Sequence, residues 1–392
     1  MSHRVSVQRH LPDVLARRAL RLRGRAVTEP YFQDDAVTLY HGDALAVLTE
    51  LPGESVDAIV TSPPYFGLRD YGVTATDWPE TTYTPMVGLP DVTVPAMTSP
   101  LGLEPSPQAY IAHMVAIFRE ARRVLAGDGV MWLNLGDSYA SLGGNGRGAG
   151  SALQGRKHGP AQEVAGRGSR KPGTTVHTKN MLGIPWQLAF ALQADGWILR
   201  SDTIWAKPNG MPESTKDRPS RKHEHVFLFA KSGRYWFDLD AIREPLAHPA
   251  DRPQNSWSRE TKEADVPGQR SRQHRLDRPG KGGGSNLRPT GRQHLTPDTN
   301  GGRNPGDVWT IPTSPFPQAH YAVMAPRLAE RLVTSGCKPG GVVLDPFSGA
   351  GTTGMVAGRH GRRYIGIDAS TETLDLSLST RLAQGALMDG AP

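Results

Sequence analysis

Short, almost continuously apolar runs recur along the chain between segments with helical spacing. Val56–Thr61 reads VDAIVT, and Gly129–Asp137 reads GVMWLNLGD. Apolar runs of this length, bounded by polar residues, glycine and proline, predict strands that are buried on both faces of a sheet. The strands expected on this basis cover residues 36–43, 56–61, 129–137, 197–207, 224–232, 341–347 and 362–368.

The clearest helical pattern lies between the second and third of these strands. Ile111, Met114 and Phe118 recur at the spacing of one helix face, and Ser106 and Pro107 stand where an N-cap and a first helical residue belong. Further helices are expected within 44–51, 184–196, 325–336 and 348–361. Strands that alternate with helices predict an α/β protein with a doubly wound, mostly parallel sheet.

Three stretches depart from this alternation. Residues 72–105 are rich in Thr and Pro, residues 142–178 in Gly and Arg, and residues 248–305 are polar, basic and rich in Gly and Pro. We interpret all three as long loops or insertions.

The basic charge is concentrated in three segments. Residues 1–30, 141–180 and 251–305 carry net charges of +5, +6 and +5, whereas the whole chain carries +7, so the remainder is acidic. This distribution is typical of a protein that binds a polyanion. Solvated, disordered stretches are the alternative that charge alone leaves open.

The composition argues against several kinds of protein. Cys337 is the only cysteine, which excludes an internal disulfide, makes a cysteine-based metal site unexpected and fits a reducing compartment. No run of about eighteen apolar residues is present, and the first residues lack the apolar centre of a secretory signal. We expect a cytoplasmic protein without a membrane segment.

Two stretches carry candidate chemistry. TSPPY, residues 61–65, ends an expected buried strand, where two prolines cannot serve sheet pairing and instead make a rigid polar corner. The second stretch, LDPFSGAGTTG from residue 344, is a strand and a glycine turn that opens a helix, and Asp368 closes the next strand. Such a turn allows a cofactor to approach the backbone, and such an acid can bind a ribose. Both nicotinamide cofactors and S-adenosylmethionine contain that ribose, but Asp345 disfavours a pyrophosphate and suits a cationic methionine.

Together these stretches resemble the DNA amino-methyltransferases, which methylate the exocyclic amine of cytosine or adenine. The corner precedes the glycine loop, as in the permuted, beta-type members, and the similarity covers most of residues 36–245 and 306–370. The resemblance implies the S-adenosylmethionine-dependent methyltransferase fold, a Rossmann-like sheet of seven strands with one antiparallel strand near an edge and long loop insertions. It implies four parts: a basic extension (1–35), a catalytic half (36–245, with insertions 73–100 and 142–178), a target-recognition insertion (246–305) and a cofactor-binding half (306–392).

The resemblance assigns catalysis to the corner. The Ser62 hydroxyl and the Pro63 carbonyl would accept hydrogen bonds from the target amine, Pro63 and Pro64 would hold the corner rigid, and Tyr65 would stack on a flipped-out base. For Thr352 and Thr353 a helix-capping role is the alternative to a cofactor contact, and Asn134 and Asp137 would shape the base pocket or bridge loops. The expected cofactor is S-adenosylmethionine, without a metal, and its expected ligands are Asp43, Asp345, Phe347, Gly349, Gly351, Thr352, Thr353 and Asp368.

Double-stranded DNA is the expected partner, in a bacterial or phage-infected cell. Basic side chains in two places are expected to contact it, with surface salt bridges as the alternative for the first three: Lys207, Arg218, Lys222, Arg270, Arg272 and Arg275. A partner restriction endonuclease is left open, and so is the choice between monomer and homodimer.

Ser62, where the adenine enzymes typically have aspartate, favours site-specific methylation of cytosine N4, as in restriction-modification or DNA protection. Adenine N6 is the alternative, because a hydroxyl accepts from either amine. A catalytically inactive DNA-binding protein with this fold is a more distant alternative. A dehydrogenase would leave TSPPY unexplained, and protein glutamine methylation uses an Asn-led corner.

Overall fold

The computed structural model describes residues 29–68, 72–140, 176–245, 302–316 and 323–382. The chain divides into two units, residues 1–241 with 306–392 and residues 242–305. In the second unit, the backbones of Glu244 and Arg303 form an antiparallel bridge. Most of the expected segments 1–35, 142–178 and 246–305 lies outside the described residues, as do Arg270, Arg272 and Arg275.

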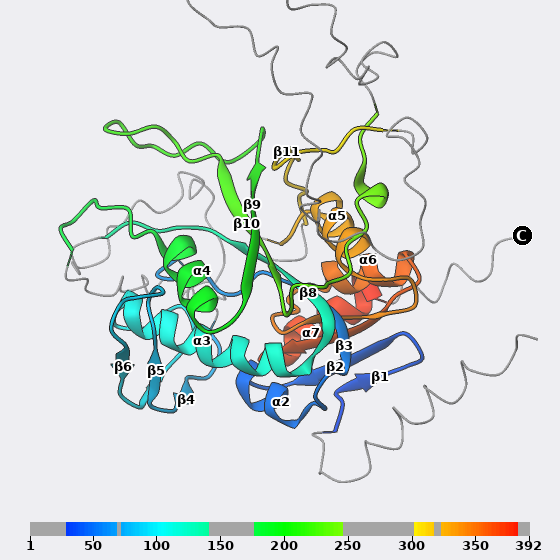
Figure 1. Ribbon diagram of the computed structural model, residues 1–392, viewed down its shortest axis with the longest axis horizontal. Coiled ribbons are helices and arrows are strands. Elements are labelled where there is room, and N and C mark those ends of the chain that lie inside the picture. Colours follow the sequence, from blue (N-terminus) through cyan, green and yellow to red (C-terminus); the bar gives the residue numbers. More distant parts are fainter. Residues whose placement is uncertain (1–28, 69–71, 141–175, 246–301, 317–322, 383–392) are drawn as a thin grey trace, which may run out of the picture. The chain divides into compact units, whose positions relative to one another are not determined.

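A nine-stranded sheet organises the first unit, in the order β1-β2-β13-β12-β3-β8-β10-β9-β11 (Figure 1). Its strands are β1 (Phe32–Gln33), β2 (Val37–His41), β3 (Val56–Thr61), β8 (Leu125–Leu135), β9 (Ile198–Ala206), β10 (His223–Ala230), β11 (Val308–Thr310), β12 (Val342–Asp345) and β13 (Arg363–Asp368).

The seven longer strands form the expected mostly parallel sheet. Five neighbours, β2, β13, β12, β3 and β8, are parallel. β10 is antiparallel to both β8 and β9, so it is the one reversed strand among the seven. The α/β Rossmann-like fold is therefore confirmed. The expected number of seven strands is corrected to nine, because the short strands β1 and β11 pair with the exposed edges of β2 and β9.

Helices cover both faces of this sheet. Contacts join α2 to α3 and α3 to α4 on one face, and α5 to α6 on the other (Figure 1). Ser106 caps α3 as expected, since its hydroxyl accepts from the amide of Ala109 at 3.2 Å. The helices are α2 (Ala44–Glu50), α3 (Pro107–Val124), α4 (Ile184–Ala194), α5 (Pro326–Gly336), α6 (Thr352–Arg359) and α7 (Thr371–Ser377), with a π-helical turn at Leu378–Leu382 and a 3-10 turn at Asp240–Ile242. In the part of the chain that the structure describes, no helix is long and apolar enough to cross a membrane.

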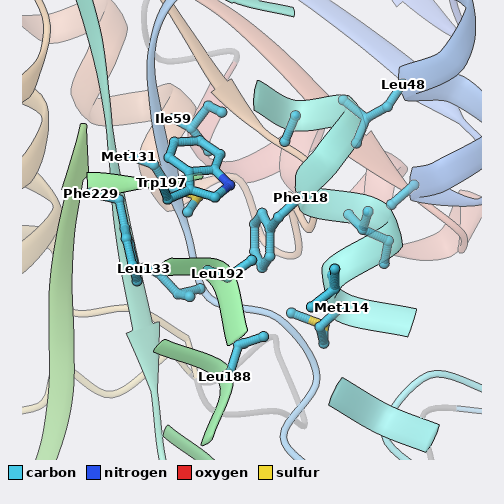
Figure 2. Close-up of a cluster of buried hydrophobic side chains, with 14 of the residues drawn as sticks. Leu48, Ile59, Met114, Phe118, Met131, Leu133, Leu188, Leu192, Trp197 and Phe229 are labelled. Carbon is cyan, nitrogen blue, oxygen red and sulfur yellow. The ribbon is translucent and has the colours of Figure 1, made fainter. Parts of the chain in front are cut away.

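The main hydrophobic core lies between the sheet and helices α2, α3 and α4. Figure 2 shows Phe118 of α3 pointing toward Trp197 and Leu192, with Met131 and Leu133 of β8 facing them. All five of these side chains are at most 2% exposed. Burial of this apolar area fixes α3 and α4 against the sheet.

The insertion at residues 73–100 differs from the expected irregular loop. It forms two antiparallel ribbons, β4 (Thr76–Trp78) with β7 (Met97–Ser99) and β5 (Thr81–Tyr83) with β6 (Val92–Val94). Trp78 is 2% exposed, and its ring stacks on that of His113 of α3. The ring centres are 4.2 Å apart and the angle between the ring planes is 9°. The insertion is thus part of the hydrophobic core.

We expect Trp78→Ala to lower the free energy of unfolding by about 3–5 kcal/mol, because it empties a buried aromatic site. Val87→Ala, at the exposed tip of the same insertion, is the matched control and should change it by less than about 0.5 kcal/mol. Urea unfolding followed by far-UV circular dichroism measures both. Equal effects from the two variants would contradict the packing of the insertion on α3.

Candidate active site

The candidate chemistry gathers at one edge of the sheet. β2, β13, β12, β3 and β8 are parallel, so their carboxyl ends meet there. This edge carries, in sheet order, Asp43, Asp368, the turn after Asp345, the Ser62–Tyr65 corner and Asn134. Asp43 and Asp368 are far apart in the sequence but follow neighbouring strands, as Gly42 donates its amide to the Asp368 carbonyl at 3.0 Å.

The carboxylate of Asp345 joins the corner to the glycine loop. Its Oδ1 accepts from the Thr61 hydroxyl at 2.6 Å and from the Phe347 amide at 3.1 Å. Its Oδ2 accepts from the Thr353 hydroxyl at 2.9 Å. Asp345 is only 4% exposed. Its three hydrogen bonds link the end of β3, the start of the loop and the start of α6.

Burial sets the protonation of this carboxylate. Desolvation raises the pKa of Asp345 to about 6, and the donors Thr61, Thr353 and Phe347 oppose that rise because they favour the charged form. The folded protein thus holds this proton more tightly than an unfolded chain. The contribution of Asp345 to stability accordingly falls as pH rises from the ordinary Asp pKa through about 6.

The loop after Asp345 adopts a conformation that favours glycine. Gly349 and Gly351 have φ of +51° and +74°. Oδ2 of Asp368 accepts from the Gly349 amide at 2.8 Å, and its Oδ1 accepts from the Ser370 amide at 2.9 Å. Burial raises the pKa of Asp368. These bonds attach the loop to the end of β13.

The edge fits the expected S-adenosylmethionine. The Asp368 carboxylate has lone pairs beyond its two amide bonds, so it can also accept from ribose hydroxyls. A Cβ built on Gly349 would meet only the Phe347 carbonyl, at 3.8 Å, so the loop backbone is open to close approach. Asp43 caps α2 through Ala46 and accepts from Thr76, yet it stays partly exposed. Phe347 packs partly buried against the core.

Three of the expected cofactor ligands use their side chains within the protein. Asp345 has the three donors described above, and the Thr353 hydroxyl is one of them. The Thr352 hydroxyl accepts from Arg381, and Thr352 is 4% exposed. These side chains hold the loop and the first turn of α6.

The corner is held from two sides. The Tyr110 hydroxyl of α3 donates to the Pro64 carbonyl at 2.9 Å. The Tyr65 ring lies so close to Gly136 that a Cβ built there would be 2.6 Å from its Cε2. A side chain at position 136 would therefore displace the ring. The corner is rigid because of these contacts as well as its prolines.

A chain of hydrogen bonds leads from Ser62 into the protein. The Ser62 hydroxyl donates to the Tyr65 hydroxyl at 3.3 Å, which donates to Oε2 of Glu224 at 2.8 Å. Nδ2 of Asn134 donates to the same Oε2 at 3.0 Å and also lies 3.0 Å from the Tyr65 oxygen. Lys207 pairs with Oε1 of Glu224. An ionised carboxylate only accepts, so it sets the direction of the whole chain.

Glu224 was missed by the sequence analysis. It is the second residue of β10, and because β10 is antiparallel to β8 its first residues lie beside the last residues of β8. A charged residue at the start of an apolar strand was the available signal. The sequence does not show that this strand is inserted between β8 and β9 in reverse.

Of the other expected residues, only Lys207 belongs to this network among those that the structure describes. Asp137 caps α4, since its carboxylate accepts from the amides of Ser138, Gly183 and Ile184. Arg218 pairs with Glu213 at 2.7 Å and lies over the Tyr139 ring at 3.9 Å, and Lys222 is exposed. Lys207 pairs with Glu224, and a salt bridge was the alternative to a phosphate contact for this residue. Over the described residues, no group of three His, Cys, Asp or Glu side chains could hold a metal ion.

The chain is similar to known proteins in sequence and in fold. Residues 56–379 match the family described as DNA methylase. The chain is 37% identical to the Type II methyltransferase M.Cfr9I of Citrobacter freundii over 345 residues, which are 88% of this chain and 87% of that protein. It is likewise 37% identical to the Type II methyltransferase M.XycI of Xanthomonas campestris pv. cyanopsidis, over 87% and 86% of the two chains. The solved structure of PvuII DNA methyltransferase (cytosine-N4-specific) shares the fold, with a TM-score of 0.51, 17% identity and coverage of 89% and 88%.

The link at Asp345 predicts a pH-dependent loss of stability in Thr61→Val. A hydrogen bond to an ionised carboxylate contributes about 1.5–3 kcal/mol, so the variant should lose that much at about pH 8. The loss should be smaller at about pH 5, where Asp345 is protonated. Thr49→Val, which removes an exposed hydroxyl that donates to the Ala46 carbonyl of α2, is the control. Urea unfolding at both pH values measures this, and a loss that does not depend on pH would contradict the link.

Proposed function

The chain belongs to the DNA methylase family, as a Type II DNA methyltransferase of the group that methylates cytosine N4 or adenine N6, and we propose that it methylates N4 of cytosine. The methyl group comes from S-adenosylmethionine, and the target base is flipped out of duplex DNA. The match to the family confirms the prediction of a DNA amino-methyltransferase.

The observation that carries the proposal is the orientation of Ser62. The hydroxyl proton of Ser62 is donated to the Tyr65 oxygen, because the Tyr65 hydroxyl proton is donated to Glu224. The Ser62 oxygen also accepts from Nδ2 of Asn134 at 3.5 Å, and it keeps a lone pair for an N–H group of a target amine. Such an amine is a poor nucleophile while its own lone pair is delocalised into the ring. Acceptors at Ser62 and the Pro63 carbonyl favour a tetrahedral nitrogen with that lone pair released, and a preorganised corner provides them without rearrangement.

The proposed cofactor lies along the same edge of the sheet. Asp368 would bind the ribose hydroxyls, Asp43 would lie near the adenine, and the Gly349–Gly351 backbone and Phe347 would line the methionine side. When bound, S-adenosylmethionine supplies an electrophilic methyl group next to the corner. Asp345, Thr352 and Thr353 would act by holding the loop in place.

Cytosine is proposed over adenine because the corner begins with Ser62. By the family resemblance, serine there is associated with N4-cytosine enzymes and aspartate with adenine enzymes. Adenine N6 stays the alternative, since the Ser62 hydroxyl can accept from that amine as well.

The proposed target site is a specific DNA sequence, protected against a partner endonuclease of a restriction-modification system. Recognition would come from residues 246–305, including Arg270, Arg272 and Arg275. Exposed Lys222, with Arg218, is proposed to contact phosphates.

We expect Ser62→Ala to lower the single-turnover rate of methyl transfer to DNA by about 100-fold or more, because the amine loses an acceptor placed for the transition state. The dissociation constant for S-adenosylmethionine should stay near the wild-type value. Ser232→Ala, just after the carboxyl end of β10, is the matched control. Transfer of a radiolabelled methyl group and calorimetry measure the two quantities. A parallel loss of cofactor binding would contradict the role of Ser62.

A further inference from the structure

The Glu224 carboxylate lies behind the corner and accepts from the Tyr65 hydroxyl at 2.8 Å. Its side chain is 16% exposed and receives three donors: the Tyr65 hydroxyl, Nδ2 of Asn134 and the ammonium of Lys207. Lys207, 19% exposed, compensates the charge of this largely buried carboxylate and also lies 4.8 Å from the centre of the Trp205 ring. If Glu224 served only as the ion-pair partner of Lys207, it would not need to accept from Tyr65, which in turn accepts from Ser62.

We infer that Glu224 is the final acceptor of the proton that leaves the methylated amine. The inference rests on the proposed function, because it needs an amine at Ser62. Three side chains form a continuous series of hydrogen bonds, in which Ser62 donates to Tyr65 at 3.3 Å and Tyr65 donates to Glu224 at 2.8 Å. Each oxygen in that series can pass on one proton as it receives another.

The transfer balances without a further reactant. The nitrogen lone pair forms the new N–CH3 bond, and the electron pair of the broken S–CH3 bond stays on sulfur. The nitrogen then carries a positive charge and two protons. One of these moves to the Ser62 oxygen, the Ser62 proton moves to the Tyr65 oxygen, and the Tyr65 proton moves to Oε2 of Glu224. The products are a neutral methylated amine and an uncharged Glu224 carboxyl group, which returns the proton to water once the DNA has left.

Neighbouring residues keep this series in place. Asn134 holds both the Tyr65 oxygen and Glu224 through one Nδ2 group, at 3.0 Å from each. Gly136 gives the Tyr65 ring the space it occupies. Asn134 is therefore a positioning residue, whereas Ser62 is the group in direct contact with the amine.

The test compares Glu224→Gln with the double variant Lys207→Met/Glu224→Gln. Glutamine can still accept from Tyr65 and Asn134 through its oxygen, but it cannot take up a proton. In the single variant its NH2 group would face the Lys207 ammonium, a donor against a donor, and the double variant removes that conflict. We expect both to slow methyl transfer by at least about 100-fold in single turnovers at saturating DNA and cofactor, the usual scale for loss of a positioned base.

Readouts other than turnover separate proton transfer from a structural role. Cofactor binding by calorimetry, and base flipping by the fluorescence of a base analogue at the target position, should match the wild type in both variants. Glu330→Gln, which removes a carboxylate of α5 paired with His360, is the matched control and should keep the wild-type rate.

Three results would overturn the inference. They are a wild-type rate in Glu224→Gln, recovery of the rate in the double variant, and loss of base flipping in proportion to loss of rate. In each case the wild-type chain still methylates DNA, so the proposed function stands. A wild-type chain that neither binds S-adenosylmethionine nor methylates DNA would instead contradict the proposed function itself.

Discussion

The rest of the site depends on the buried carboxylate of Asp345. The corner and the glycine loop are separated by most of the chain, yet β3 and β12 are neighbours in the sheet, and Asp345 joins their ends through Thr61, Phe347 and Thr353. Burying a carboxylate is unfavourable unless donors compensate it, and here they compensate it only in part, since the pKa of Asp345 is raised to about 6. The benefit is a fixed distance between the Ser62–Tyr65 corner and the glycine loop. The rate of methyl transfer between two bound molecules is sensitive to that distance.

Strand direction provides the second half of the site. The parallel strands bring the cofactor loop and the corner to one edge, and the reversed strand β10 brings its first residues to that same edge. Glu224 thereby reaches Tyr65 and Asn134 from the opposite chain direction. The corner thus combines a rigid backbone, an acceptor facing outward and a carboxylate behind it, which together suit an unreactive amine that must gain a methyl group and lose a proton.

The sequence predicted most of the scaffold, because its signals are local. Apolar runs located the seven longer strands, Ser106 and Pro107 located the start of α3, and the glycine spacing located the loop. The ribbons of residues 73–100 were not predicted, because strands of three residues are too short to show a period and depend on Trp78 packing against His113. Side-chain partners were not predicted either. Whether Asp345 meets a cofactor or two threonines, and whether Lys207 meets a phosphate or Glu224, depends on strand neighbours far away in the sequence.

The most direct measurement is the nucleoside composition of DNA from a methylation-free host that expresses the chain, by mass spectrometry, with single-molecule sequencing to locate the modified base. We expect N4-methylcytosine within one recurrent sequence, and none in DNA from the same host carrying an empty vector. N6-methyladenine in its place would contradict the assignment to cytosine. Unmodified DNA from cells that contain the soluble protein would contradict catalysis by this chain.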